Sequence, residues 1–326
     1  MSRYDEEAKY DRPKRHTRPR TKERPKYADA VTGFVITRDR GRYTCWVGEE
    51  ERAVTAMKAR QLGRKGVIVG DLVKLDGDAS GDEGTLARIV EVEPRRTLLR
   101  RSADDDDPVE RPLVANADQL VIVTAVANPE PRPRLIDRCL VAAYDAGMRP
   151  LLCLTKTDLA DPEPLLAIYR PLGVESVATQ GDGNLDALIE QLKDRTSVLV
   201  GHSGVGKSTL VNALVPGADR AIGVVNVVTG RGRHTSTTAL VLRLPFGGWI
   251  VDTPGIRSFG LAHVQPDQLI NAFGDLAAET QDCPRGCTHS ENEPSCALDA
   301  AVEAGRVDPE RVASFRRLLA SREGRD

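Results

Sequence analysis

The sequence lacks long apolar runs. No stretch of about 18 consecutive apolar residues occurs, so the pattern predicts no transmembrane helix. The N-terminal residues are charged and include no apolar h-region, so we expect no secretory signal and a cytoplasmic location. Thiols stay reduced in that compartment, and we therefore interpret the six cysteines as core residues or metal ligands before disulfides.

A strong net charge is also missing. The formal charge of −2 gives by itself no sign of a nucleic-acid partner. The basic residues are concentrated, however, in a predicted flexible arm over residues 1–28, where eight Lys or Arg and one acid lie between Arg12 and Lys26. This segment has too few large apolar residues to fold alone, but it can neutralise phosphates. Contact with RNA and a solvated tail without a partner are both open.

The chain length of 326 residues predicts two or three domains. Residues 29–95 carry five or so short β-rich runs, which predict an OB-fold-like barrel that binds nucleic acid or contacts only protein. In residues 96–265, apolar strands such as Gln119–Val126 alternate with helical stretches such as Arg134–Ala146. This alternation predicts a parallel sheet covered by helices on both faces. Residues 266–326 are predicted to be a helical domain that contains a cysteine cluster.

The clearest motif is GHSGVGKST, which matches G-x-x-x-x-G-K-[ST] between an apolar strand and a helical stretch. Its glycines allow successive N–H groups to face a phosphate, and the helix N-terminus adds a partial positive charge. We expect Lys207 to reach the β- and γ-phosphates and the Ser208 hydroxyl to bind Mg²⁺. The predicted nucleotide-binding loop comprises Gly201, His202, Ser203, Gly204, Val205, Gly206, Lys207, Ser208 and Thr209.

A second motif, DTPG, follows the predicted strand Trp249–Val251. Its first residue, Asp252, is an acid at the end of a parallel strand and is predicted to hold Mg²⁺, usually through water. The N–H of Gly255 could then sense the γ-phosphate. Both assignments depend on the P-loop upstream, because DTPG alone is a common turn sequence.

A third motif, TKTD, consists of Thr155, Lys156, Thr157 and Asp158 and resembles the guanine-reading N-K-x-D motif. The Asp158 carboxylate can accept hydrogen bonds from the guanine N1–H and exocyclic amine, a pair that adenine does not offer, and the Lys156 stem would cover the base. Thr155 stands where Asn is usual, which leaves open both the contact at guanine N7 and the attachment of this loop to the P-loop. Val177–Thr179 is a candidate second base-contacting loop.

The order of these motifs is unusual, because TKTD precedes the P-loop, whereas ordinary GTPases carry their guanine-reading motif late. Circular permutation preserves such a site while moving the chain ends. The basic, hydroxyl-rich segment Val228–Thr238 is a predicted switch, in which Thr237 or Thr238 could close onto Mg²⁺. Ile256 occupies the position where many GTPases carry a water-orienting Gln. His234 is the nearest candidate for that role, and a surface histidine is the alternative.

The cysteine cluster consists of Cys283, Cys287, His289 and Cys296. Three thiolates and one imidazole within a short segment are typical of a tetrahedral Zn²⁺ site. Four protein ligands leave no open coordination position, so the predicted zinc is structural rather than catalytic.

Together, these motifs resemble the RsgA (YjeQ) family of circularly permuted GTPases over about residues 28–326. The resemblance implies a multi-domain protein: an OB-like β-barrel, a central permuted α/β P-loop GTPase domain and a C-terminal helical zinc-binding domain. It also implies GTP hydrolysis stimulated by the small ribosomal subunit, late maturation of that subunit, and contact of the barrel with rRNA. In the family, the histidine that matches His234 has been considered as a water-positioning group, and the zinc ligands match the four residues above.

We therefore predict a GTP hydrolase with one structural Zn²⁺ and with Mg²⁺ bound alongside GTP. The predicted partners are GTP or GDP and the small ribosomal subunit, with no membrane partner and a monomeric state. Two other functions stay under consideration. One is a regulatory GTP-binding module that acts on a protein, and the other is an ATPase, against which Asp158 argues.

Overall fold

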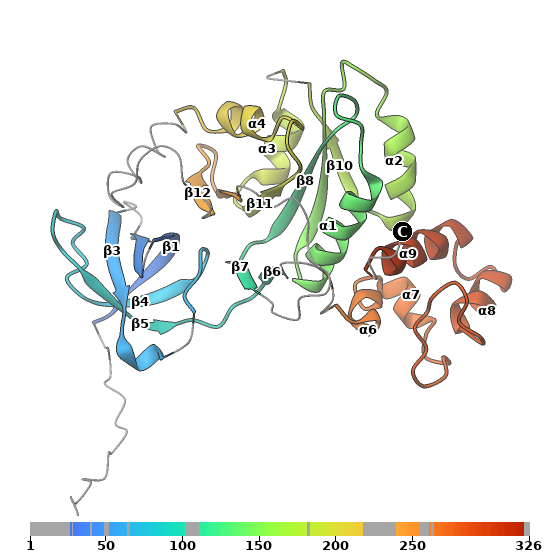
Figure 1. Cartoon of the computed structure of the whole chain (residues 1–326), viewed down its shortest axis with the longest axis horizontal. Coiled ribbons are helices and arrows are strands. Elements are labelled where there is room, and N and C mark those ends of the chain that lie inside the picture. The colour runs from blue at the N-terminus through green and yellow to red at the C-terminus, as the bar shows by residue number, and fades with distance from the viewer. Residues whose placement is uncertain are drawn as a thin grey trace, which may run out of the picture.

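The computed structural model describes residue 27 and residues 29–39, 41–48, 52–63, 66–101, 111–180, 183–217, 239–253, 261 and 264–322. These residues form three parts: an N-terminal barrel, a central sheet with helices and a C-terminal group of helices (Figure 1). Within the described chain, no helix is both long and apolar enough to span a bilayer.

The N-terminal part is a closed five-stranded barrel with the strand order β1-β2-β3-β5-β4. Its strands are β1 (Val31–Asp39), β2 (Arg42–Val47), β3 (Arg52–Lys58), β4 (Leu72–Gly77) and β5 (Ala87–Val92), with a short 3-10 helix η1 (Arg60–Leu62) after β3. Neighbouring strands are antiparallel except β3 and β5, which pair in parallel. Apolar side chains from all five strands fill the interior, among them Val35, Cys45, Val54, Val73 and Ile89. The predicted barrel is confirmed.

One predicted strand is shorter than the sequence suggests. The run from Gly66 to Leu75 looks like a continuous strand, but only Leu72–Gly77 pairs as β4. Gly70 has φ +88°, and a Cβ there would lie 2.0 Å from the carbonyl oxygen of Ala115. The fully buried Asp71 accepts the N–H of Ile68 at 2.8 Å and pairs with Arg95. This turn therefore joins the barrel to the next part of the chain.

The central sheet has the order β10-β9-β8-β11-β13-β12. Its strands are β8 (Gln119–Ala125), β9 (Arg149–Thr155), β10 (Glu175–Ala178), β11 (Thr196–Val200), β12 (Leu240–Arg243) and β13 (Trp249–Asp252). All neighbours are parallel except the edge strand β12, which runs antiparallel to β13. The prediction of a parallel sheet is thus correct except at this edge.

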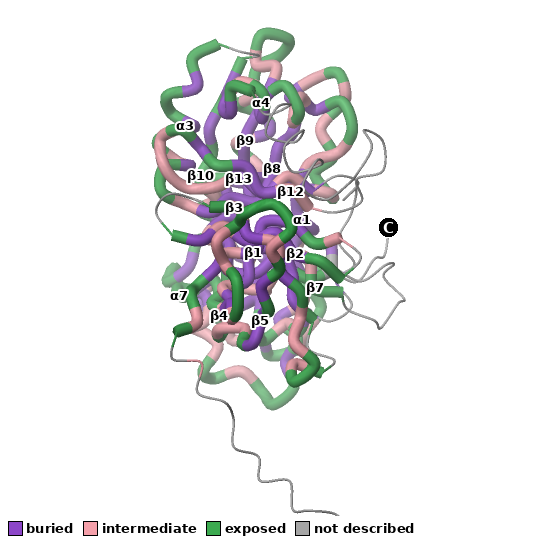
Figure 2. The backbone as a smooth tube through the Cα atoms, turned by 90° about the vertical axis from the view of Figure 1, so that its left-hand side faces the viewer, coloured by how far each residue is buried: buried purple, intermediate pink, exposed green. Residues whose placement is uncertain are grey.

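Helices cover both faces of the sheet, as predicted. They are α1 (Pro133–Asp145), α2 (Glu163–Tyr169), the short 3-10 helix η2 (Arg170–Leu172), α3 (Asp186–Leu192) and α4 (Lys207–Leu214). The side chains of α1 and α2 belong to one apolar cluster and those of α3 and α4 to another. Residues alternate between the two clusters along β8, where Leu120 and Ile122 join the first and Val121 and Val123 the second. Figure 2 shows this buried interior in purple between exposed turns.

A two-stranded hairpin that the sequence did not reveal, β6 (Leu98–Arg101) and β7 (Arg111–Ala115), lies between the barrel and the sheet (Figure 1). Asn116 follows it with φ +56°, a conformation that asparagine tolerates. Its side-chain amide donates to the carbonyl of Gly70 at 2.9 Å and accepts the N–H of Arg96 at 2.8 Å. The buried Asn116 side chain therefore connects the barrel turn at Gly70 to the segment that leads into the hairpin.

The C-terminal part contains α6 (Pro266–Ile270), α7 (Gly274–Ala278), α8 (Ala297–Glu303) and α9 (Pro309–Arg322). In the sequence, Asp308 followed by Pro309 predicts a helix start, and α9 indeed begins at Pro309. The spacing of Val312, Phe315 and Leu319 predicts one apolar helix face, and all three residues are buried. This face packs against α1, and its side chains join the same apolar cluster as the α1 side of the sheet.

Candidate nucleotide site and metal centre

The P-loop connects the end of β11 to the first turn of α4. A Cβ at Gly201 would lie 2.4 Å from the carbonyl oxygen of Val123, so only glycine fits at the start of this turn. Gly206 adopts φ +92° immediately before the helix begins at Lys207. Ser208 and Thr209 are exposed on the first turn. The backbone thus has the glycine-dependent course that phosphate binding requires.

The structure brings Asp252 to the P-loop. β13 runs parallel to β11, with Asp252 in register with Leu199. The Lys207 ammonium lies 2.8 Å from an Asp252 carboxylate oxygen, and both side chains are more than two-thirds buried. The hydroxyl of Thr253 donates to the Leu199 carbonyl at 3.0 Å and fixes the segment that follows β13. The predicted phosphate-binding lysine and the predicted Mg²⁺ acid therefore lie together at the carboxyl ends of β11 and β13.

The TKTD segment begins at the carboxyl end of β9, on the same side of the sheet as the P-loop. Thr155 is buried, and its hydroxyl lies 2.6 Å from the carbonyl oxygen of Val205 in the P-loop. Lys156 has φ +57°, and its ammonium donates to the Asn128 carbonyl. Asp158 is exposed. The attachment of this loop to the P-loop, which the sequence left open, is therefore made by the threonine hydroxyl.

Two further threonines connect TKTD to the candidate second base-contacting loop. The Thr157 hydroxyl donates to the Thr179 carbonyl at 3.2 Å. The Thr179 N–H in turn donates to the carbonyl of Leu154 at the end of β9, at 2.7 Å. The P-loop, TKTD and Val177–Thr179 are thus held together by three threonines, and the exposed carboxylate of Asp158 stands beside them.

Several predicted site residues lie outside the described part of the chain. They are His234, Thr237, Thr238, Gly255 and Ile256. His202, inside the P-loop, is described: its Nε2 is buried and has no hydrogen-bond partner among the described residues. Neither that buried nitrogen nor the hydrogen bond from Thr155 to the P-loop was foreseen, because each depends on side-chain packing.

The predicted metal ligands converge. One ligand atom from each of Cys283, Cys287, His289 and Cys296 lies within 4.8 Å of all the others. His289 Nδ1 is 3.6, 3.4 and 3.7 Å from the three sulfurs, respectively. Zn–S and Zn–N bonds of ordinary length at tetrahedral angles separate S and N by about 3.6 Å. The four residues therefore fit a single metal ion with Nδ1 as the histidine ligand.

The surroundings of the cluster suit metal binding. Burial lowers the pKa of His289, which favours the neutral imidazole that can act as a ligand. Burial raises the pKa of the Cys287 thiol to about 12, so a metal ion would be needed to stabilise its thiolate. Arg316 on α9 donates to the carbonyl of His289 at 3.2 Å and pairs with Asp299 at 2.8 Å. The cluster is therefore attached to the last helix.

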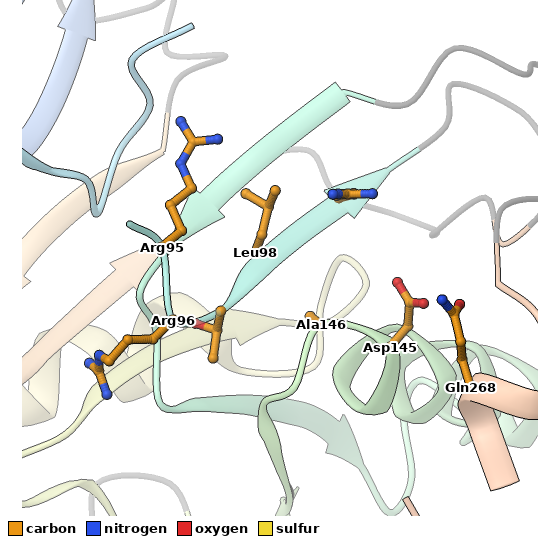
Figure 3. A pocket seen from close by; sticks show the side chains of 8 residues that line it. Arg95, Arg96, Leu98, Asp145, Ala146 and Gln268 are labelled. Carbon is orange, nitrogen blue, oxygen red and sulfur yellow. The ribbon is translucent and has the colours of Figure 1, made fainter. Parts of the chain in front are cut away.

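A pocket of about 390 Å³ lies away from the P-loop, at the junction of the hairpin, α1 and α6 (Figure 3). It is lined by Arg95, Arg96, Thr97, Leu98, Arg100, Asp145, Ala146 and Gln268. Arg95 pairs with Asp71 at 2.7 Å, and Arg96 pairs with Asp118 at 3.2 Å. Figure 3 shows these two guanidinium groups pointing in different directions. The carboxylates of Asp71 and Asp118 therefore balance the charges of Arg95 and Arg96.

Comparisons with known proteins agree with this geometry. The family model described as RsgA GTPase matches residues 92–262. A small ribosomal subunit biogenesis GTPase RsgA from Ectopseudomonas mendocina is 44% identical over 265 residues, which cover 78% of this chain and 75% of the relative. The RsgA of Pseudomonas aeruginosa is 45% identical over 251 residues, covering 74% and 73%, respectively.

Two solved structures are similar along most of the chain. The crystal structure of YjeQ from Thermotoga maritima superposes with a TM-score of 0.67 and 28% identity, covering 91% of this chain and all of that one. The structure of YloQ, described as a circularly permuted GTPase, gives a TM-score of 0.66 and 25% identity over 91% of this chain and 96% of YloQ.

Fold and site together define a P-loop GTPase whose motifs run in circularly permuted order. Along the chain, its GTPase domain follows a β-barrel and precedes a Cys₃His cluster. The chain belongs to the RsgA GTPase family. It is therefore an enzyme that hydrolyses GTP.

Proposed function

We propose that this GTPase acts in the late maturation of the small ribosomal subunit and that the subunit stimulates its turnover. The relatives named above are small ribosomal subunit biogenesis GTPases, and they match about three-quarters of the chain. The observation that carries the proposal is that TKTD, the P-loop and Asp252 meet at the carboxyl ends of the parallel strands. A regulated GTPase needs its base-binding and phosphate-binding residues held in fixed positions relative to one another.

Within this proposal, the P-loop residues Gly201–Thr209 bind the phosphates, and Lys207 reaches the β- and γ-phosphates. Ser208 would supply an oxygen ligand to Mg²⁺, Asp252 would hold the ion through water, and Thr237 would be the switch ligand. The metal ion would neutralise developing charge on the phosphates.

Base recognition is assigned to the TKTD segment. Asp158 is exposed three residues beyond the end of β9, where its carboxylate is free to accept hydrogen bonds from the guanine N1–H and exocyclic amine. The Lys156 stem covers the base. Thr155 and Thr157 hold this loop in place through their hydrogen bonds to the P-loop and to the Thr179 carbonyl.

His234 is proposed to position the attacking water. The N–H of Gly255 is proposed to sense the γ-phosphate. Ile256 cannot orient water, because its side chain has no hydrogen-bonding group. Turnover without a partner should therefore be slow. A partner that orders the switch around His234 would raise it, which agrees with stimulation by the ribosomal subunit.

The Cys₃His cluster is proposed to hold one structural Zn²⁺. Its donor set and its sulfur–nitrogen distances support this assignment. The metal would hold together the loop segment between α7 and α8, which has few apolar residues of its own. The barrel and the basic arm are the proposed rRNA contacts, and the protein is proposed to act as a monomer.

The test is GTP turnover by the full-length chain with and without purified small ribosomal subunits. The proposal predicts slow intrinsic turnover that small subunits raise by at least about tenfold, and large subunits should not replace them. Lys207→Ala should abolish both rates, and Asp158→Asn should weaken GTP binding. Turnover that ignores ribosomal subunits but is lost in Lys207→Ala would keep the GTPase and exclude the ribosomal partner. A protein activator would then be sought.

A further inference from the structure

The hydroxyl of Thr155 has one proton, and the protein uses it. Oγ1 lies 2.6 Å from the Val205 carbonyl oxygen and 3.3 Å from that of Thr124. Both neighbours are acceptors, so the hydroxyl donates its proton to one of them. The shorter distance indicates that this acceptor is the Val205 carbonyl. A threonine hydroxyl has no second proton, so only its lone pairs remain for a further contact.

The Thr155 side chain also faces Gly206, at the end of the P-loop. A Cβ added to Gly206 would lie 3.7 Å from Thr155 Oγ1 and 3.8 Å from its Cβ, so only the space of one side-chain carbon separates the glycine backbone from this side chain. Gly206 is the residue before α4, and Lys207 follows it. The hydrogen bond from Thr155 to Val205 therefore holds the P-loop two residues before the phosphate-binding lysine.

The guanine side of the site imposes a different requirement. Guanine N7 is a hydrogen-bond acceptor, so it needs a donor. The asparagine found in most guanine-reading motifs carries an NH₂ group with two protons, which can serve a P-loop carbonyl and N7 together. Thr155 can serve only one of them, and its proton is directed at the P-loop.

We propose that Thr155 is a positioning residue for the P-loop and that the TKTD loop reads guanine without a hydrogen bond to N7. This inference rests on the base site proposed above. It assigns base discrimination to the guanine N1–H and amine, through Asp158. Guanine nucleotides that lack the N7 acceptor should therefore bind as well as the natural ones.

The first experiment measures the Kd of the full-length chain for GDP and for 7-deaza-GDP by calorimetry. The wild-type chain should bind the two within about twofold. Thr155→Asn restores a second proton and should prefer GDP by roughly two- to tenfold, the worth of one hydrogen bond. A wild-type chain that loses fivefold or more with 7-deaza-GDP would overturn the inference.

The Asp158→Asn variant separates this inference from the proposed base site. It should weaken GDP and 7-deaza-GDP equally. If it leaves GDP binding unchanged, the base-site assignment itself fails. If it weakens both ligands while the wild-type chain rejects 7-deaza-GDP, the base site stands and only the statement about N7 is wrong.

The positioning role is tested with Thr155→Val and Thr155→Ser. Valine keeps the shape but leaves the Val205 carbonyl without its donor, and GDP affinity should fall roughly tenfold. Serine keeps the hydroxyl and should restore GDP affinity to near the wild-type value. Guanosine, which has no phosphates, should bind Thr155→Val and wild type alike. An equal loss of guanosine and GDP affinity would contradict action through the P-loop, as would failure of serine to restore binding.

Discussion

The barrel and the C-terminal helices attach to the central sheet in different ways. The barrel closes on itself around its own apolar interior. It meets the sheet through outward-facing residues: Ile36 belongs to the apolar cluster of the sheet, and the ring of Phe34 lies 5.4 Å from that of Trp249. The C-terminal helices have no such separate interior among the described residues. Phe273 and Phe315 instead belong to the apolar cluster of α1 and the sheet.

Polar contacts strengthen this difference. Arg317 on α9 lies 3.1 Å from the buried carboxylate of Asp137 on α1, and its guanidinium group stacks over Tyr169. Arg311 donates to the Pro171 carbonyl at 2.7 Å, and Arg138 donates to that of Ser321 at 3.2 Å. Because the barrel has an apolar interior of its own and the C-terminal helices share theirs with the sheet, these helices should unfold together with the sheet, whereas the barrel should unfold separately.

The largest expected effect comes from removing the proposed metal ion. Structural zinc contributes roughly 10–16 kcal/mol to the folding of small zinc-binding peptides. A strong chelator should therefore increase amide exchange across residues 283–303 and, through the shared interior, in α9 and α1, as measured by mass spectrometry. Exchange in β1–β5 should not change. The chelator should add nothing in Cys287→Ser, and protection of residues 283–303 that survives chelation would contradict the metal assignment.

Phe315→Ala tests the shared interior directly. Phe315 is fully buried, and its ring packs edge-on against Phe273 at 5.4 Å. The free energy of unfolding should fall by about 3–5 kcal/mol, because truncation of a buried phenylalanine leaves a cavity. Urea unfolding should show a single transition for the C-terminal helices and the sheet, and the substitution should move this whole transition to lower urea. If only residues 264–322 became less stable, the two parts would be separate units.

Leu75→Ala is the matched variant in the barrel. Leu75 is 1% exposed inside the barrel interior. Its truncation should cost about 2–5 kcal/mol, but only in the barrel strands. Amide exchange should therefore rise in β1–β5 and stay the same in α1, α9 and the P-loop. Loss of protection in α1 would show that the barrel is not independent.

The smallest effect concerns the pH dependence of the joint between α1 and α9. Burial raises the pKa of Asp137, and the nearby Arg317 opposes this only in part. Because the pKa in the folded state is then above that in the unfolded state, this group favours folding most at low pH, and the benefit is lost as pH rises through the raised pKa.

The measurement compares wild type with Asp137→Asn, which cannot titrate. The difference in free energy of unfolding, wild type minus variant, should decrease as pH rises from the ordinary aspartate pKa towards neutrality. Urea titrations across that range give the difference directly. A difference that increases with pH would mean that pairing with Arg317 outweighs burial, so that the pKa is lowered.

The sequence predicted the segments whose chemistry is local. The P-loop, TKTD and the Cys₃His cluster are each contained in a short stretch, so their residue types and spacing, with the P-loop as context for TKTD, predicted what they bind. The apolar run Gln119–Val126 likewise predicted β8 within one residue of its observed end. Of the β-rich run over residues 66–75, only the part from Leu72 pairs as β4. Before it the chain turns at Gly70, which has φ +88° and lies close to the backbone of Ala115.

Contacts between distant residues were decided only by the tertiary structure. Thr155 and Val205 are 50 residues apart, and Asp137 and Arg317 are 180 apart. The sequence identified Thr155 as a departure from the usual asparagine but could not show where its proton goes. It likewise revealed the apolar face of α9 but not the helix that covers it. A side chain's hydrogen bonds and burial depend on which elements pack beside it, and that packing is set by the whole chain.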